Sequence, residues 1–176
     1  LNISDMLFRY GIRINPALVQ DLQCMPVPVD VSDNAQQPNW QPMPWTYAPL
    51  LLTSQASPIT RNIMQVSATM ASCIDLVGEE DGLHKTTLLA TSTNSKHTTS
   101  PAEVNLSLFN GTEADFKYAF IPVAASIEGV FTSLYAHLLP PEDLQLHAPL
   151  RKKSEPTKQI VVAAGSTIRN EWQQGQ

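Results

Sequence analysis

Histidine and hydroxyl side chains are the first candidates for chemistry, because nucleophilic catalysis needs a nucleophile, a base and a group that orients the base. The histidines are His84, His97, His137 and His147. Ser133 and His137 are four residues apart, which on a strand puts them on one face but too far apart for contact. None of the histidines lies in a hydrolase motif. The sequence therefore predicts a protein that is not an enzyme.

Metal and cofactor motifs are also missing from the sequence. It contains no Cys-x-x-Cys, no His-Glu-x-x-His and no phosphate-binding glycine loop, and it has only 7 glycines. The acidic residues 79–81, between Gly78 and Gly82, would need more widely spaced oxygen ligands to hold a cation. They indicate a hydrated hairpin tip. We therefore predict no metal and no cofactor.

Aromatic side chains are the best candidates for a binding surface. Trp40, Trp45 and Tyr47 lie within residues 34–49, a stretch rich in Pro, Gln and Trp that predicts an extended surface loop. Their flat faces could stack on a glycan or contact a partner protein. The alternative is that they cover one end of a β-sandwich. These three are the contact residues that we predict.

Composition restricts the class of function. The net charge of −5 and the pI of about 5.2 argue against a general nucleic-acid binder. The basic run 151–153 could contact a phosphate, although Pro149 and Pro156 flank it and favour a solvated loop. Charged residues make up 15% of the chain, below the roughly 25% of an average soluble domain. A surface so low in charge favours coverage by neighbouring proteins.

The cysteines and the apolar runs indicate little about compartment. Cys24 and Cys73 each lie in an apolar run, so we expect buried free thiols, and a disulfide between them stays open. Asn2, Asn105 and Asn110 begin glycosylation sequons. No apolar run reaches the length of a membrane span, and no signal peptide is visible.

The elements that would position these side chains are mainly strands. Residues 104–109 alternate apolar and polar side chains, and Asn110-Gly111 favours a chain reversal. Aromatic residues recur at a spacing of two in residues 116–120, and residues 130–139 continue the extended pattern. These three runs predict an antiparallel sheet with one face in a core.

The rest of the chain predicts one β-sandwich domain of 176 residues. Residues 3–10 predict a short helix that ends at Gly11. Pro26 and Pro28 indicate an edge strand or an extended arm, because proline cannot donate to a ladder. The Ala and Met content of residues 62–77 leaves a helix as the alternative to a strand there. Further strands are predicted at residues 17–31, 62–77, 84–92 and 160–164, loops at 91–101 and 142–158, and a surface tail at 169–176.

Three stretches together resemble the capsid proteins of picorna-like viruses. Residues 3–10 are similar to a helix that precedes the core strands in those proteins. Residues 116–120 resemble one of their strands, with an aromatic-basic-aromatic pattern, and residues 135–141 resemble another that runs into prolines. The terminal Gln176 agrees with release from a viral polyprotein, and Leu1 with a processed chain or a fragment. The resemblance implies a mainly β, antiparallel β-sandwich of the viral jelly-roll type with one or two short helices.

The resemblance also implies a function. It implies a structural capsid protein that assembles with other coat subunits into an icosahedral shell in the virion, with viral RNA on the inner surface and a host receptor as further partners. In that family the helix lies inside the jelly roll, after the first strands, whereas here it begins the sequence. A jelly roll without those first strands would be incomplete, and its open edge would pair with another segment. The alternative is a surface-exposed attachment or carbohydrate-binding domain that uses Trp40, Trp45 and Tyr47.

Overall fold

A computed structural model describes residues 3–33, 37–78, 82–106, 112–136 and 151–169. The described chain is mainly β, and its strands pair antiparallel, which confirms the predicted fold class. The elements in chain order are the helix α1 (Ile3–Arg9), the strands β1 (Ile12–Ile14), β2 (Ala17–Asp21), β3 (Cys24–Asp30), β4 (Trp40–Thr53), β5 (Gln65–Ser67), β6 (Ile74–Leu76), β7 (Leu83–Ala90), β8 (Ser95–Thr99), β9 (Pro122–Gly129) and β10 (Thr157–Val162), and the 3₁₀ turns η1 (Glu113–Asp115) and η2 (Gly165–Ile168).

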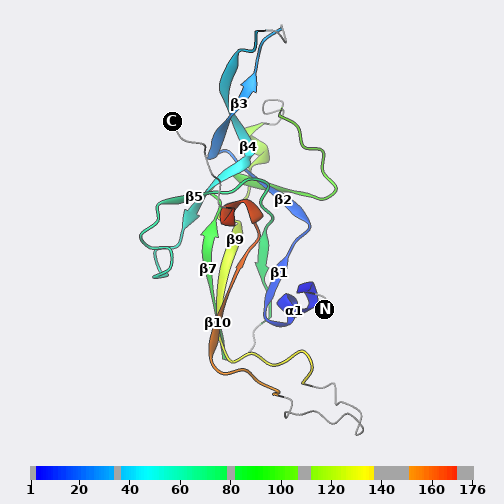
Figure 1. Cartoon of the computed structure of the whole chain (residues 1–176), viewed down its shortest axis with the longest axis vertical. Helices are drawn as coiled ribbons and strands as arrows, with labels where there is room; N and C mark the ends of the chain where they lie inside the picture. The colour runs from blue at the N-terminus through cyan, green and yellow to red at the C-terminus, as the bar shows by residue number, and fades with distance from the viewer. Residues whose placement is uncertain (1–2, 34–36, 79–81, 107–111, 137–150, 170–176) are drawn as a thin grey trace.

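The described strands form three sheets. The largest has the order β10-β9-β7-β4-β3, and β5 pairs with β4 beside this path. The pairs β1–β6 and β2–β8 form two smaller sheets. In Figure 1, the β3–β4 hairpin projects from one end of the molecule, while β7, β9 and β10 run together through its middle. The smaller sheets contribute buried side chains to the core, namely Val19 from β2 and Ile12 and Ile74 from β1 and β6.

The strand β9 contributes to both clusters of buried apolar side chains. Five successive residues of this strand, 123–127, are buried, so both of its faces are covered. Val123 and Ala124 belong to one cluster of buried apolar side chains, and Ala125 and Ile127 belong to the other. A strand covered on both faces has no reason to alternate polar and apolar residues. For this reason the periodicity of the sequence did not predict β9.

The predicted central strands are wrong in position. Residues 104–106 form no strand, and residues 130–136 form none beyond an isolated bridge between Thr132 and Lys153. Residues 107–111 and 137–139 lie outside the described chain. Residues 116–120 are irregular, and their β-pairing is limited to an isolated bridge between Ser95 and Tyr118. Phe120 has a φ of 55°, which no extended strand accommodates. The aromatic spacing of two in this segment therefore marks a loop that crosses the end of the core.

Three further boundaries differ from the predictions. Residues 62–77 are not one strand, because Met70 has a φ of 56° and separates β5 from β6. Much of the predicted loop 34–49 belongs to β4, and the predicted loop 91–101 contains β8. The prolines of β4 are compatible with a strand, since Pro42 and Pro44 lie opposite Pro28 and Pro26 at the edge of the sheet.

Several predictions are confirmed. The helix at residues 3–10 is α1, and Gly11 follows it with a φ of 88°. The stretch 17–31 contains β2 and β3, and β3 is an edge strand of the large sheet, as its prolines indicated. The strands predicted at residues 84–92 and 160–164 correspond to β7 and to the end of β10.

Both cysteines are free thiols, as expected, although only Cys73 is fully buried and Cys24 is half-buried. Burial, followed by the nearby charge of Asp21, raises the pKa of the Cys24 thiol above its ordinary value. Within the described ranges, no helix has the length and apolar character needed to cross a membrane. The acidic residues 79–81, the sequon residues Asn2 and Asn110, His137, His147 and the tail from residue 170 onward lie outside the described chain.

Candidate functional site

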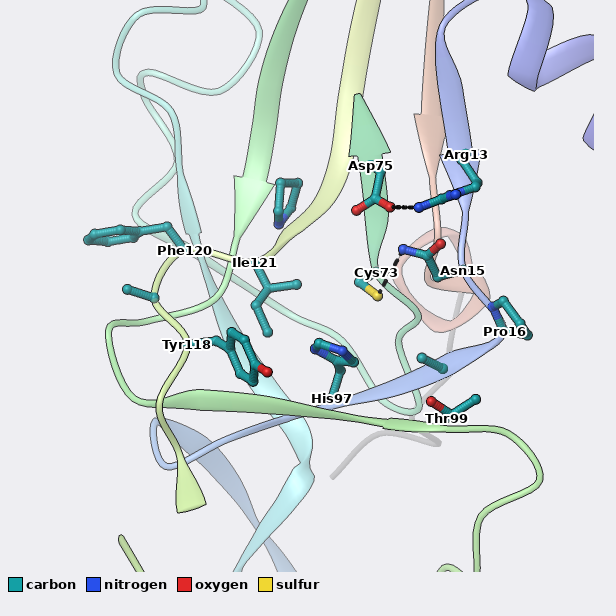
Figure 2. A pocket seen from close by; sticks show the side chains of 13 residues that line it. Arg13, Asn15, Pro16, Cys73, Asp75, His97, Thr99, Tyr118, Phe120 and Ile121 are labelled. Atoms are coloured by element: carbon teal, nitrogen blue, oxygen red, sulfur yellow. Dashed lines mark hydrogen bonds and ion pairs between the residues drawn. The ribbon is translucent and has the colours of Figure 1, made fainter. Parts of the chain in front are cut away.

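A groove of about 590 Å³ lies where the two small sheets meet the loop before β9. Small-molecule sites commonly have volumes of roughly 300 to 1,000 Å³, so its size fits a small ligand. We call it the cross-sheet groove, and its chemically active lining consists of Arg13, Asn15, Cys73, Asp75, His97, Thr99, Tyr118 and Phe120. Figure 2 shows Arg13 and Asp75 at one end, Tyr118 and Phe120 toward the other, and His97 between them.

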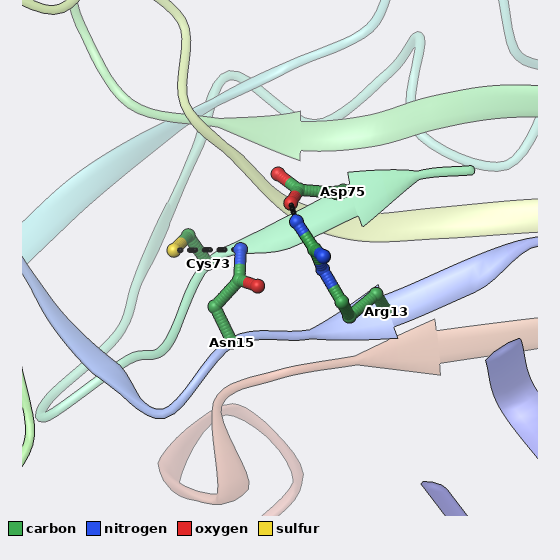
Figure 3. A network of polar contacts seen from close by, with 4 residues as sticks. All are labelled: Arg13, Asn15, Cys73 and Asp75. Atoms are coloured by element: carbon green, nitrogen blue, oxygen red, sulfur yellow. Dashed lines mark hydrogen bonds and ion pairs between the residues drawn. The ribbon is translucent and has the colours of Figure 1, made fainter. Parts of the chain in front are cut away.

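The polar end is built by the pairing of β1 with β6. This pairing sets Arg13 directly opposite Asp75. The neighbouring Ile12 and Ile74 are fully buried, and since side chains alternate along a strand, Arg13 and Asp75 point to the open side. Arg13 Nη2 donates to Asp75 Oδ2 at 2.5 Å, and Asn15 Nδ2 lies 3.5 Å from Cys73 Sγ (Figure 3). The sheet therefore holds a cation and an anion side by side at the mouth of the groove.

The charge of Asp75 is fixed by its neighbours. The hydrogen bond from Arg13 lowers its pKa most, a hydrogen bond from Asn15 lowers it further, and the charges of Arg13 and His97 add to the effect. Asp75 is therefore ionised at neutral pH. A ligand at this end meets an acceptor and a donor of opposite charge in fixed positions.

Replacing Arg13 tests this electrostatic assignment. In Arg13→Met, the pKa of Asp75 should rise toward its ordinary value of 3.8, because its strongest hydrogen-bond donor is gone. A depressed pKa stabilises the folded state above the unfolded value of about 3.8, and this stabilisation disappears as the pH falls through the folded value. The stability of the variant should therefore depend less on pH below about 4. A carbon-detected NMR titration of the Asp75 carboxyl measures the shift.

The matched control is Arg61→Met, which removes an exposed arginine from the loop between β4 and β5. It should leave the Asp75 titration unchanged. An Asp75 pKa that is identical in the wild type and in Arg13→Met would contradict the assignment.

The aromatic end is held by backbone pairing with β8. Tyr118 and Ser95 exchange backbone hydrogen bonds of 3.0 and 2.9 Å. The rings of His97 and Tyr118 lie 5.0 Å apart at 43°. Both side chains are exposed, so a ligand can reach the imidazole, the phenol and the faces of both rings.

Phe120 has the unusual conformation at this site. Its φ of 55° is left-handed, a region that a bulky residue adopts only at a cost. Its side chain is 56% exposed and also lines a second cavity of about 290 Å³, together with Leu52 and Leu88. The ring thus stands between two hollows, and the hydrogen bond from its N–H to Ser92 O, 2.9 Å long, holds the backbone there. Strained backbone of this kind is typical of functional sites.

Phe120→Gly should reduce ligand binding while leaving the free energy of unfolding almost unchanged. Glycine removes the left-handed strain of roughly 1 kcal/mol but loses a similar amount through its greater freedom in the unfolded chain. We therefore expect the free energy of unfolding to stay within about 0.5 kcal/mol of the wild type, below the roughly 1 kcal/mol loss of an average substitution. Urea denaturation measures it.

Met70→Gly is the matched control, because Met70 has a φ of 56°, is 41% exposed and does not line the cross-sheet groove. It should match Phe120→Gly in stability, whereas only Phe120→Gly should reduce ligand binding. A loss of more than about 2 kcal/mol in Phe120→Gly would mean that the ring packs as a structural residue.

The predicted contact residues lie elsewhere, on β4. The rings of Trp45 and Tyr47 are 6.0 Å apart, and Trp45 Nε1 donates to Asn105 O at 3.2 Å. Trp40 is 62% exposed at the start of the strand, and among the described residues it has no ring contact with the other two. The structure thus brings together two of the three residues. A role for them in partner binding stays a prediction.

The sequence missed the cross-sheet groove because its residues are far apart in the chain. Arg13 and Asp75 are 62 residues apart, and His97 and Tyr118 come from two further segments. The one local signal is the alternation Arg13-Ile14-Asn15 before Pro16, which indicates a short strand with a polar face. Within the described ranges, no three His, Cys, Asp or Glu side chains are placed to hold a metal ion. The side chains of the groove offer charge, hydrogen bonds and aromatic faces.

Comparison with known proteins identifies the family. A family model described as an ABC-type uncharacterized transport system matches residues 1–176, the whole chain. No curated protein and no solved structure gives a significant match. The family match overturns the resemblance to viral capsid proteins. The capsid function, the coat-subunit, RNA and receptor partners, the virion location and the alternative of an attachment domain are therefore wrong. Short helices and aromatic strands occur in many β proteins, and this explains the false resemblance.

Proposed function

Since the chain belongs to the family described as an ABC-type uncharacterized transport system, we propose that it serves such a system as an auxiliary binding domain. The cross-sheet groove would hold a small ligand, and the role would be binding without catalysis. The observation that carries the proposal is the convergence of a charge pair, a histidine and a strained aromatic residue on one groove of about 590 Å³.

The two ends of the groove indicate the kind of ligand. Arg13 and Asp75 are partly exposed, at 54% and 42% of their side-chain surface, and would bind a polar or charged head group. Tyr118 and Phe120 would pack against an apolar or aromatic body. A ligand with both parts would use the whole groove, with His97 as the hydrogen-bonding group between them.

A comparison of two single variants, one inside the groove and one outside it, tests the proposal. Small molecules that remain bound to the chain purified from its source are identified by mass spectrometry, and their affinity is measured by calorimetry. His97→Ala should weaken binding about tenfold, equivalent to roughly 1.4 kcal/mol. His84→Ala removes an exposed histidine of β7 that lies outside the groove, and it should leave the affinity unchanged.

Equal losses of ligand affinity in His97→Ala and His84→Ala would mean that binding does not use the groove. Conversion of the bound compound by the wild-type chain would contradict the part of the proposal that assigns binding without catalysis.

A further inference from the structure

The two edge strands of the large sheet differ in their proline content. At one edge, β3 carries Pro26 and Pro28, which lack the N–H groups that another strand would need. At the other edge, β10 has the sequence TKQIVV, without proline or glycine. Edge strands of soluble proteins are commonly blocked by proline, charge or a bulge. Only one edge of this sheet is blocked by proline.

The backbone groups on the outer side of β10 can be identified because N–H and C=O directions alternate from residue to residue along a strand. The Ala163 N–H donates to Val123 O at 2.9 Å, toward β9. The register between β10 and β9 is continuous from Thr157 to Val162, so hydrogen-bonding directions alternate along it. The N–H and C=O groups of Lys158, Ile160 and Val162 therefore point away from β9. Within the described residues, β9 is the strand that pairs with β10, and the sheet order ends there.

The side chains of β10 suit a neighbouring strand. Ile160 is 53% exposed, which is unusual for a large apolar side chain in the middle of an edge strand. Lys158 Nζ is paired with Glu128 Oε1 of β9 at 3.0 Å, so its charge is already partnered within the sheet. The strand thus lacks an unpaired charge that would repel a partner of the same kind.

We propose that β10 is a dimerisation edge, at which it pairs antiparallel with β10 of a second copy of this chain. A two-fold axis through Ile160 makes Ile160 face itself and Lys158 face Val162 of the other copy. In this register no like charges are opposed, and the exposed isoleucines cover each other. The two strands would extend the large sheet across both copies. The groove lies on other elements, so this interface is independent of the proposed ligand.

The dimer should be weak and reversible, because one strand pair buries less than the roughly 800 Å² per partner of a standard stable interface. Analytical ultracentrifugation of the wild-type chain from about 1 to about 500 μM should show a shift from monomer to dimer. Ile160→Pro should stay monomeric across this range. It should also remain folded, because the N–H that it removes points away from β9.

Disulfide trapping tests the register even where the proline variant fails to fold. In a Cys24→Ser background, Ile160→Cys should form a covalent dimer under mild oxidation, since facing residues in a hydrogen-bonded pair have Cα atoms about 5.5 Å apart. Lys158→Cys is the matched control, because its two copies would lie more than about 10 Å apart.

A wild-type chain that is monomeric at every concentration would overturn the proposal. Equal crosslinking of the two cysteine variants, or a dimer that persists in Ile160→Pro, would overturn it as well, since the contact would then use another surface. Retention of ligand binding by a monomeric Ile160→Pro would show that the groove and the edge act separately.

Discussion

Replacing Asp21 with alanine should destabilise the chain by about 3 to 4 kcal/mol, the largest effect that we expect from one substitution. Asp21 is fully buried, and its carboxylate accepts three hydrogen bonds. Gln23 N and Ser92 Oγ donate to Oδ1 at 2.8 and 2.6 Å, and Ser92 N donates to Oδ2 at 2.6 Å. This single side chain joins the turn after β2 to the segment after β7. Alanine would leave three donors without a partner in the interior.

Two controls separate this effect from the loss of any aspartate. Asp21→Asn keeps the size and one acceptor but points an amide at a donor, so its loss should be about half that of alanine. Asp30→Ala removes a carboxylate that accepts the Ser32 and Asn39 N–H groups at 3.0 and 2.9 Å, yet it is exposed to water, so its effect should be clearly smaller. Urea denaturation measures all three. Equal losses at Asp21 and Asp30 would contradict the role of burial.

Thr91→Val should cost about 2 to 3 kcal/mol and should loosen the wall of the groove. Thr91 is fully buried, and its hydroxyl accepts the Ile121 N–H at 2.8 Å. The same oxygen lies 2.8 Å from Ser95 Oγ, which donates to Tyr118 O at 2.8 Å. These bonds fix the segment that carries Tyr118 and Phe120. Valine has nearly the same shape but leaves the Ile121 N–H unsatisfied.

Hydrogen exchange provides the second readout for Thr91. Exchange at the Ile121 amide should accelerate more in Thr91→Val than the global loss of stability requires, because the loop would open locally. Thr87→Val replaces a half-buried threonine of β7 and is the control. A protected Ile121 amide in Thr91→Val would show that this polar network does not hold the loop.

The fold class could be predicted from the sequence, whereas the central strand could not. The helix α1 was visible from its apolar side and from Gly11, and the edge position of β3 from Pro26 and Pro28. In contrast, β9 is covered on both faces, and its small residues give no alternation. The sequence patterns predicted strands that run through Met70 and Phe120, but both residues have a positive φ, which an extended strand does not allow. The side chains of Met and Phe do not predict a positive φ, so these interruptions could not be predicted.

The candidate site was beyond prediction for a related reason. Local patterns report which face of a strand is polar, but not which distant strand will face it. Arg13 meets Asp75 only because β1 pairs with β6, and His97 meets Tyr118 only because the loop before β9 crosses β8. The aromatic residues of β4 were conspicuous in the sequence because three of them lie within eight positions. Their proximity in sequence gave a candidate surface, while the groove is formed by tertiary contacts.

Binding in the cross-sheet groove is tested most directly by an amide NMR map of the chain titrated with the compound that co-purifies with it. We expect the shifted amides to cluster at Cys73, Thr99, Ala119 and Phe120, with those of the β3–β4 hairpin unchanged. Shifts that cluster on the hairpin around Trp40 and leave the groove unchanged would contradict the account.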